Sequence, residues 1–126
     1  MSPSPGPGEQ VRHMSPITSH VLDTATGRPA IGLRVRLDVL EADGRTRTIA
    51  ERVTNDQGRI TDFVPPGTLG AQTYRLTFDT GGYFATSGRP HFYPHVDVVF
   101  TVVDADEHHH IPLLLSPFGY STYRGT

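Results

Sequence analysis

The amino-acid sequence predicts an all-β fold, a sandwich of two sheets built from about eight strands with one short helix. Two observations predict this class. Short runs in which apolar and polar residues alternate recur along the chain, and clusters of Gly, Pro, Asn and Asp separate them. No segment keeps a period of 3.6 residues over three helical turns, so helices contribute little.

The first element is a tail. Residues 1–14 alternate Pro with Ser and Gly, and such a composition buries too little apolar surface to offset the entropy lost on ordering. They also lack the apolar stretch of a secretory signal. We therefore expect a flexible segment over 1–14 and one domain over 15–126, which is close to the commonest domain size.

Strands are predicted from residue 17 onward. At 33–39 and again at 74–78, apolar residues alternate with polar ones, and each run predicts a strand with one buried face. The run 96–103 is more uniformly apolar and predicts a central strand that is covered on both faces. Further strands are expected at 17–23, 46–54, 59–64 and 108–116, with a short one near 120–124.

Turn signals separate these runs at 25–29, 42–44, 55–58 and 65–67. A brief helix is expected near 80–87, although Gly81 and Gly82 lower its helix propensity.

Composition excludes several classes of function. The formal net charge is −2, with acids and bases mixed along the chain, so there is no electrostatic footprint for nucleic acid or for an anionic membrane. No apolar run reaches the roughly 18 residues of a membrane span. The chain has no cysteine, which excludes disulfides, thiolate catalysis and cysteine-ligated metals.

Histidine is the outstanding residue type, with seven in the chain and three of them consecutive before an apolar run. Alternation along that run turns its branched apolar residues at odd positions towards the core. His108, His110, Pro112 and Leu114 then share the opposite face. A face with two imidazoles and a leucine indicates a cleft or a surface covered by a partner subunit. Pro112 lacks a backbone donor and predicts an edge position or a bulge.

Two further residues are candidates for chemistry. If Ile17 and Val21 face the core, His20 faces outward, and the simplest interpretation is a surface histidine on a strand. Arg59 directly follows a turn in which Gly58 supplies positive φ, so it also fits the first residue of a returning strand. The planar donor fork of an arginine nevertheless suits an anionic or carbonyl-rich planar ligand.

A metal site is an open alternative. Side chains at positions i and i+2 of a strand project together, so His108 and His110 form a possible ligand pair, and His20 would complete a three-histidine zinc site. This spacing permits a metal without specifying one. The two tyrosines near the C-terminus indicate that the tail is docked, and for Tyr120 a structural anchor is the simpler interpretation.

Taken together, these segments resemble the 5-hydroxyisourate hydrolase family, the enzymatic relatives of transthyretin. The resemblance runs from about residue 17 to the last residue and is most specific in the C-terminal run Ile-Pro-Leu-Leu-Leu-Ser-Pro-Phe-Gly-Tyr-Ser-Thr-Tyr-Arg-Gly-Thr. The matching stretches are 19–30, 54–59, 74–79 and 108–126.

The family's enzymes differ from transthyretin, a carrier, in an early histidine, an arginine after an Asn-x-x-Gly turn, a late histidine and a Tyr-Arg-Gly-Ser ending. This chain carries His20, Arg59 and His110 at the first three positions, which favours the enzyme. Three residues depart from the family pattern. Thr126 stands where serine is usual, His95 where an acid is frequent, and His109 where tyrosine is common, with its side chain expected to point away from the site.

The resemblance implies a transthyretin-like sandwich that hydrolyses 5-hydroxyisourate to 2-oxo-4-hydroxy-4-carboxy-5-ureidoimidazoline in urate catabolism, without a cofactor or a catalytic metal. It implies a cytoplasmic homotetramer, a dimer of dimers with active sites at the dimer–dimer interface, that binds neither nucleic acid nor membrane. The implied catalytic residues are His20, Arg59 and His110, and the implied substrate-binding residues are His20, Arg59, Tyr123, Thr126 and His108.

Two alternatives stay open from the sequence. One is a non-enzymatic transthyretin-like module that binds a small aromatic ligand, for which the polar set His20, Arg59 and His110 would be unnecessary. The other is a metal-dependent hydrolase that uses His20, His108 and His110.

Overall fold

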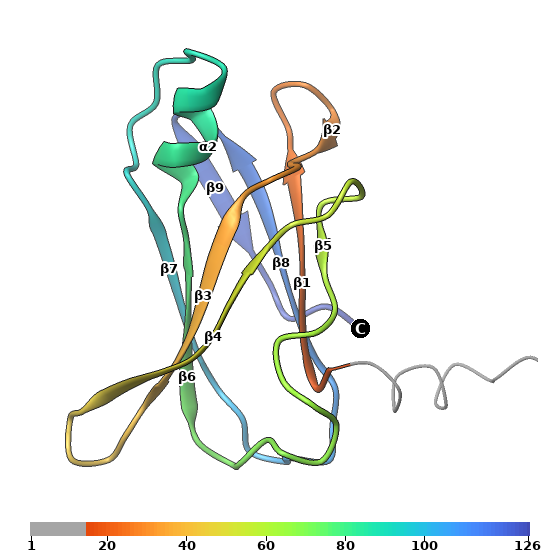
Figure 1. Cartoon of the computed structure of the whole chain (residues 1–126), viewed down its shortest axis with the longest axis vertical. Helices are drawn as coiled ribbons and strands as arrows, with labels where there is room; N and C mark the ends of the chain where they lie inside the picture. The colour runs from red at the N-terminus through yellow and green to blue at the C-terminus, as the bar shows by residue number, and fades with distance from the viewer. Residues whose placement is uncertain (1–14) are drawn as a thin grey trace, which may run out of the picture.

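The computed structural model describes residues 15–126, so the predicted flexible tail at 1–14 lies outside the described residues. Nine strands and one helix follow one another along this part of the chain (Figure 1). In order they are β1 (Ile17–Asp23), β2 (Arg28–Pro29), β3 (Arg34–Leu40), β4 (Thr46–Val53), β5 (Arg59–Ile60), β6 (Thr73–Phe78), α2 (Thr80–Thr86), β7 (Val96–Thr101), β8 (His109–Ser116) and β9 (Gly119–Thr122).

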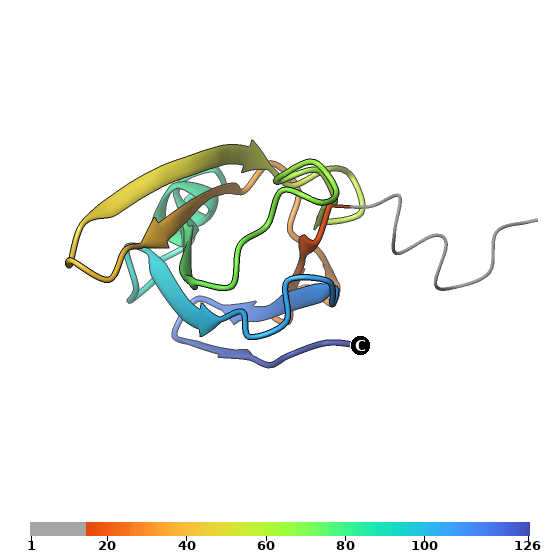
Figure 2. The same cartoon turned by 90° about the horizontal axis from the view of Figure 1, so that it is seen from below.

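The strands form two packed sheets, as the sequence predicts. One sheet has four strands in the order β4-β3-β6-β7, and the other has five, in the order β2-β1-β8-β9 with β5 pairing to β1. Seen from below, the two sheets are separate layers that enclose the core between them (Figure 2). All pairs are antiparallel except β1 with β8, which run parallel and bring the start and the end of the domain together.

The core consists of the inward-facing apolar residues of both sheets. Val21 on β1 and Leu113 on β8 are fully buried, as are Leu37 on β3 and Leu76 on β6. Because these residues alternate with polar ones along each strand, burying one face leaves the other face of each sheet free for charged groups.

Most predicted strands are confirmed, and two predictions need correction. The strand expected at 59–64 pairs only over Arg59–Ile60, after which the chain leaves the sheet. The strand expected at 96–103 is not central, since β7 is an edge strand that pairs only with β6, and Val99 is 57% exposed. An edge strand with apolar residues on its exposed face has the same composition as a strand that is covered on both faces. The apolar pattern alone therefore could not tell the two apart.

Pro112 also differs from its prediction, because β8 is an interior strand between β1 and β9. The pairing with the C-terminal segment lapses between Leu113, which faces Thr122, and His110, which faces Gly125. Pro112 lies in that gap, where its missing N–H costs no ladder hydrogen bond.

The short helix is confirmed at α2. The carboxylate of Asp79 accepts a hydrogen bond from the Gly82 N–H at 3.1 Å and so caps the first turn, which offsets the low propensity of the two glycines. Within residues 15–126 no helix is long and apolar enough to cross a membrane.

Candidate active site

Arg59 is placed beside His20 by a tight turn and a short strand pair. The side-chain oxygen of Asn55 accepts hydrogen bonds from the backbone N–H groups of Gln57 and Arg59, each at 2.9 Å. The chain then pairs with β1 so that Arg59 lies opposite His20. The turn needs its glycine, because Gly58 has a φ of +73° and a Cβ there would lie 2.5 Å from the carbonyl oxygen of Val21.

His110 reaches the same face through the parallel pairing of β8 with β1. In that register Thr18 lies opposite His110, and His20 lies opposite Pro112. Alternation turns all four side chains away from the core, as the sequence predicts for His20 and His110. Residues that are 92 positions apart in the chain are thus neighbours on one sheet.

A cleft of about 160 Å³ opens on this face. The side chains that line it come from β1, the β5 region, β8 and the C-terminal segment: Thr18, Ser19, Arg59, Thr61, His108, His110 and Thr126. His20 borders the cleft at Arg59 without lining it. No Asp or Glu side chain is among the described residues that line the cleft, and no described carboxylate forms an ion pair with Arg59.

The C-terminal segment, residues 123–126, is docked against His110, and its last residue, Thr126, lines the cleft together with Arg59 and Thr18. The Gly125 N–H donates to the His110 carbonyl at 2.8 Å. A Cβ on Gly125 would lie 2.6 Å from Cδ2 of the His110 ring, so the backbone passes directly against the imidazole. Arg124 pairs with Glu107 at 2.7 Å and fixes the segment from its other side. Thr126 therefore reaches the cleft.

The two tyrosines of this segment lie elsewhere in the single chain. Tyr123 lines a different hollow, between β7 and β8, together with His109 and Phe100. His109 is 5% exposed and points away from the cleft, as its position in the alternation predicts. The Tyr120 ring packs edge-on against Tyr93, with centroids 5.1 Å apart. That contact is consistent with an anchoring role.

Burial and Arg59 together hold the cleft imidazoles neutral. Burial, followed by the positive charge of Arg59, lowers the pKa of His20 below its ordinary value of 6.5. The same two causes, in the same order, lower the pKa of His110, and the neighbouring His108 and His20 lower it further. At pH 7 both side chains therefore carry a free lone pair and can accept a proton.

The described residues do not form a metal site. Within 15–126 no group of three or more His, Asp or Glu side chains is arranged to hold a metal ion, so the three-histidine zinc hypothesis has no support in the geometry. One nitrogen of His108 and one of His110 instead bond to the hydroxyl of Thr18, at 2.9 and 2.8 Å.

Sequence reasoning missed three residues that line the cleft, Thr18, Ser19 and Thr61, and of these Thr18 bonds to two imidazoles. It stands two positions before His20, so alternation alone puts it on the same face. The register that sets it opposite His110 depends on which strands pair, and the sequence pattern does not specify that pairing.

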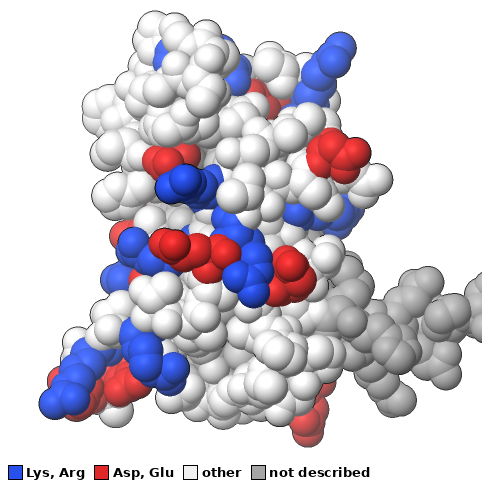
Figure 3. All heavy atoms as spheres, in the orientation of Figure 1, with Lys and Arg blue, Asp and Glu red and all other residues white. Residues whose placement is uncertain are grey.

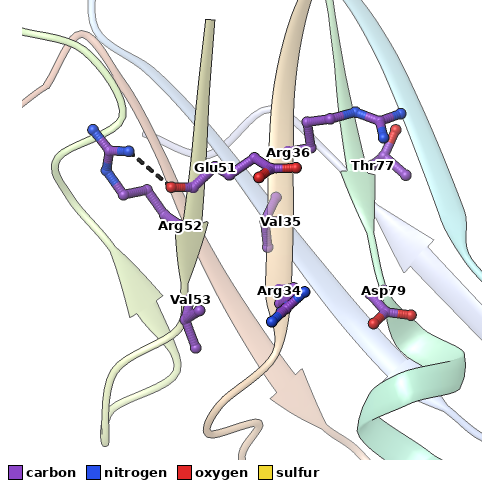
Figure 4. Close-up of a pocket in the computed structure, with 8 residues that line it drawn as sticks. All are labelled: Arg34, Val35, Arg36, Glu51, Arg52, Val53, Thr77 and Asp79. Carbon is purple, nitrogen blue, oxygen red and sulfur yellow. Dashed lines mark hydrogen bonds between the residues drawn. The ribbon is translucent and has the colours of Figure 1, made fainter. Parts of the chain in front are cut away.

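A second hollow lies on the outer face of the other sheet, where basic and acidic side chains lie side by side (Figure 3). Its lining residues come from β3, β4 and the end of β6 (Figure 4): Arg34, Val35, Arg36, Glu51, Arg52, Val53, Thr77 and Asp79. Arg36 pairs with Asp38 at 3.2 Å, and Arg52 donates to the backbone carbonyl of Glu51 at 2.8 Å. Because two of its three guanidinium groups already have partners, we interpret the charged side chains around this hollow as a network that stabilises the fold.

Comparison with known proteins decides the family. A model of the HIUase/Transthyretin family matches residues 17–125. The chain belongs to this family. The 5-hydroxyisourate hydrolase of Mus musculus is 46% identical over 113 residues, which cover 89% of this chain and 96% of that protein. The 5-hydroxyisourate hydrolase 2 of Rhizobium meliloti (strain 1021) is 47% identical over 117 residues, which cover 87% of this chain and 95% of that protein.

Solved structures of similar proteins share the fold. The 5-hydroxyisourate hydrolase of Klebsiella pneumoniae superposes with a TM-score of 0.77 at 40% identity, covering 87% of this chain and 97% of that one. Sea bream transthyretin in complex with thyroxine gives 0.84 at 32% identity, covering 89% and 96%. A structure of (S)-allantoin synthase gives 0.80 at 37% identity, and there the match covers 87% of this chain and 43% of that longer one. The predicted transthyretin-like sandwich is confirmed.

Proposed function

We propose that this chain is a hydrolase that opens the ring of 5-hydroxyisourate, a step of urate degradation, at the cleft beside β1, β5 and β8. The observation that carries the proposal is the convergence of His20, Arg59 and His110 at a cleft that no described Asp or Glu side chain lines. The curated hydrolases are also more similar to this chain than the sea bream transthyretin is, at 46% and 47% against 32% identity.

The proposed reaction adds water across one C–N amide bond of the six-membered ring. A neutral imidazole, that of His20 or His110, accepts a proton from water while the water oxygen attacks the carbonyl carbon. The imidazolium then returns the proton to the leaving nitrogen as the C–N bond breaks. A positioned general base contributes about 10²–10⁴ in rate. The product is 2-oxo-4-hydroxy-4-carboxy-5-ureidoimidazoline.

Arg59 supplies the charge that this reaction needs. Its guanidinium holds the flat, carbonyl-rich substrate and stabilises the negative charge that develops on the attacked oxygen, which is worth about 3–4 kcal/mol for a preorganised donor. His108 and Thr126 line the cleft around the ring. Tyr123 lies outside the cleft of the single chain, so a role at the substrate requires a second copy.

The proposed assembly is a homotetramer, a dimer of dimers with the cleft at the dimer–dimer interface, in the cytoplasm. Support comes from large apolar side chains that the single chain leaves exposed, among them Val99 on the edge strand β7 and Phe92 and Phe118 in the connections before β7 and between β8 and β9. Turnover should then be lost when the tetramer dissociates while each sandwich stays folded. Activity against protein concentration, with mass measured by light scattering at each point, tests this.

The deciding experiment is a spectrophotometric assay on 5-hydroxyisourate generated freshly from urate by urate oxidase. The expected result is decay many times faster than the spontaneous background. Decay at the background rate would contradict the enzyme and favour the carrier. Chelator-treated protein should keep its full activity, and loss that zinc restores would revive the metal-dependent alternative.

A further inference from the structure

One hydroxyl group is shared between two imidazoles of the cleft. Oγ1 of Thr18 lies 2.9 Å from Nε2 of His108 and 2.8 Å from Nδ1 of His110. Thr18 is 3% exposed, and the two rings are nearly parallel, with centroids 6.4 Å apart and 15° between their planes. The hydroxyl is therefore fixed between the rings by strand pairing and by burial.

Counting protons restricts what this arrangement can do. A hydroxyl has one proton to donate, and each neutral imidazole has one N–H and one lone pair. If His110 donates through Nδ1 to Thr18, its Nε2 carries the lone pair. If His110 accepts at Nδ1, its Nε2 carries the proton. Only the first tautomer leaves a nitrogen of His110 that can act as a base in the cleft.

The surroundings of His110 favour the first tautomer. Thr18 occupies Nδ1, and the Gly125 backbone covers the Cδ2 edge, so Nε2 at the ring tip is the nitrogen left for the cleft. Arg59 lines the same cleft and is near enough to lower the pKa of His110. A cation repels an N–H that points towards it and attracts a lone pair. The lone pair therefore belongs on Nε2.

His108 completes the chain of hydrogen bonds. With Thr18 accepting from His110, the Thr18 proton is available to Nε2 of His108, and in that arrangement the proton of His108 sits on Nδ1. Nδ1 of His108 is buried and makes no hydrogen bond among the described residues. Burial lowers the pKa of His108, although the backbone of Ser15 lies close enough to raise it by a smaller amount. Nδ1 lacks a partner in either tautomer of His108, so the cost of leaving it unpaired does not by itself decide between the two arrangements.

We propose that Thr18 is a positioning residue that holds His110 as the Nδ1–H tautomer, so that the Nε2 lone pair is free in the cleft to take a proton from water. The kinetic part of this inference rests on the proposed hydrolysis, whereas the tautomer itself does not. The assignment leaves His110 with a lone pair inside the cleft, which His20 only borders, and so favours His110 as the general base.

The tautomer is measured on the resting protein by ¹⁵N–¹H correlation of the imidazole nitrogens above pH 7.5, with His110 assigned by its absence in His110→Gln. The expected wild-type spectrum has His110 protonated at Nδ1 and unprotonated at Nε2. Thr18→Val removes the hydroxyl at nearly constant shape and should give a mixture of tautomers. A wild-type His110 protonated at Nε2 overturns the proposal, and so does an unchanged tautomer in Thr18→Val.

Kinetics separate positioning from packing. Thr18→Val should lower kcat about tenfold to a hundredfold, as is usual when the partner of a functional histidine is removed, with KM changed less than about twofold. Thr18→Ser keeps the hydroxyl and should restore most of kcat. Thr77→Val, which removes a hydroxyl bonded to Asp97 on the other sheet, is the matched control and should leave kcat unchanged.

The outcomes are distinguishable. An equal loss of kcat in Thr18→Ser and Thr18→Val overturns the positioning role, because it means that packing and not the hydroxyl matters. Wild-type protein that does not accelerate the decay of 5-hydroxyisourate contradicts the proposed function instead, and the nitrogen spectra still decide the tautomer.

Discussion

The outer faces of the two sheets use arginine in opposite ways. On the four-stranded sheet, Arg36 and Arg75 both pair with Asp38, a carboxylate that is 1% exposed, at 3.2 and 2.9 Å. On the five-stranded sheet, Arg59 faces imidazoles, and no described carboxylate pairs with it. A paired guanidinium stabilises the fold, whereas one without a carboxylate keeps nearby histidines neutral and remains available to a ligand. The identity of its neighbours decides the role of an arginine.

His110→Gln tests the reactive face most severely. The amide keeps a similar size and polarity but cannot accept and return a proton, so kcat should fall about 10²–10⁴-fold, the range for a lost general base. His95→Gln is the matched control, because His95 faces Asp97 on the other sheet at 3.8 Å. The assay on fresh 5-hydroxyisourate measures both variants. Similar losses in the two would refute the division of labour between the faces.

Arg59→Met asks whether the guanidinium without a carboxylate partner is the reactive one. Methionine keeps the apolar stem and removes the charge, and kcat/KM should fall about 10²–10³-fold, as when one donor to a developing oxyanion is lost. Arg34→Met removes an exposed guanidinium from the hollow of Figure 4 and should leave kcat/KM unchanged. Equal effects of the two substitutions would mean that net charge, and not position, matters.

Asp38→Asn, on the four-stranded sheet, should have the opposite effect from the substitutions at the cleft: it should lower stability and leave activity unchanged. The carboxylate accepts from Arg36, Arg75 and Thr48, and the hydrogen bonds together outweigh the effect of burial and keep the pKa of Asp38 below 3.8. Removing its charge should lower the free energy of unfolding by about 1–3 kcal/mol, since both arginines still reach water. Urea denaturation at pH 7 measures this loss, and kcat at a permissive temperature serves as the control.

The pH dependence of kcat/KM should also distinguish Arg59 from Arg34, with a smaller effect than the substitutions have on the rate itself. Because burial and then Arg59 lower the pKa of His110 below 6.5, kcat/KM should fall only on the acid side, with the midpoint of that fall below pH 6.5. Arg59→Met removes one cause of the lowered pKa and should move this acid limb to higher pH. Arg34→Met should leave the limb where it is. A limb that does not move in Arg59→Met would show that Arg59 does not tune the base.

The free energy of unfolding should also fall as the pH is lowered. The pKa values of His20, His108 and His110 are lowered in the folded chain, so the unfolded chain binds more protons near pH 6. Their contribution to stability is complete above pH 6.5 and is lost as the pH falls towards the folded values. Urea midpoints that rise on acidification from pH 7 to 5.5 would contradict this.

Local patterns in the sequence predicted which face of a strand each side chain occupies better than they predicted which strands pair. Alternation placed His20 and His110 outside the core, and the run 17–23 was predicted with the bounds of β1. Both facts depend only on a period of two along one strand. The turn signal before Arg59 and the alternation at His108 also singled out these two residues, and both line the cleft. The resemblance added Thr126, which lines the cleft, and Tyr123, which does not.

What the sequence missed depends on which strands pair. Thr18 bonds two histidines because β1 runs parallel to β8, and Pro112 is tolerated inside a sheet because β9 has ended beside it. Neither relation leaves a trace in local periodicity. The apolar run at 96–103 was misread for a related reason, since an exposed apolar face on an edge strand has the composition of a covered one.

Because β1 pairs with β8 in a parallel ladder, the proposed active site can form only after nearly the whole domain has been synthesised. Thr18 must find a partner 92 positions away, and closing so long a loop is entropically costly and slow compared with forming a hairpin. A growing chain that has emerged only as far as β7 can already pair β3, β4 and β6, yet it has no cleft at all. A complete cleft therefore requires that synthesis has reached Thr126 and that the two ends of the domain have joined.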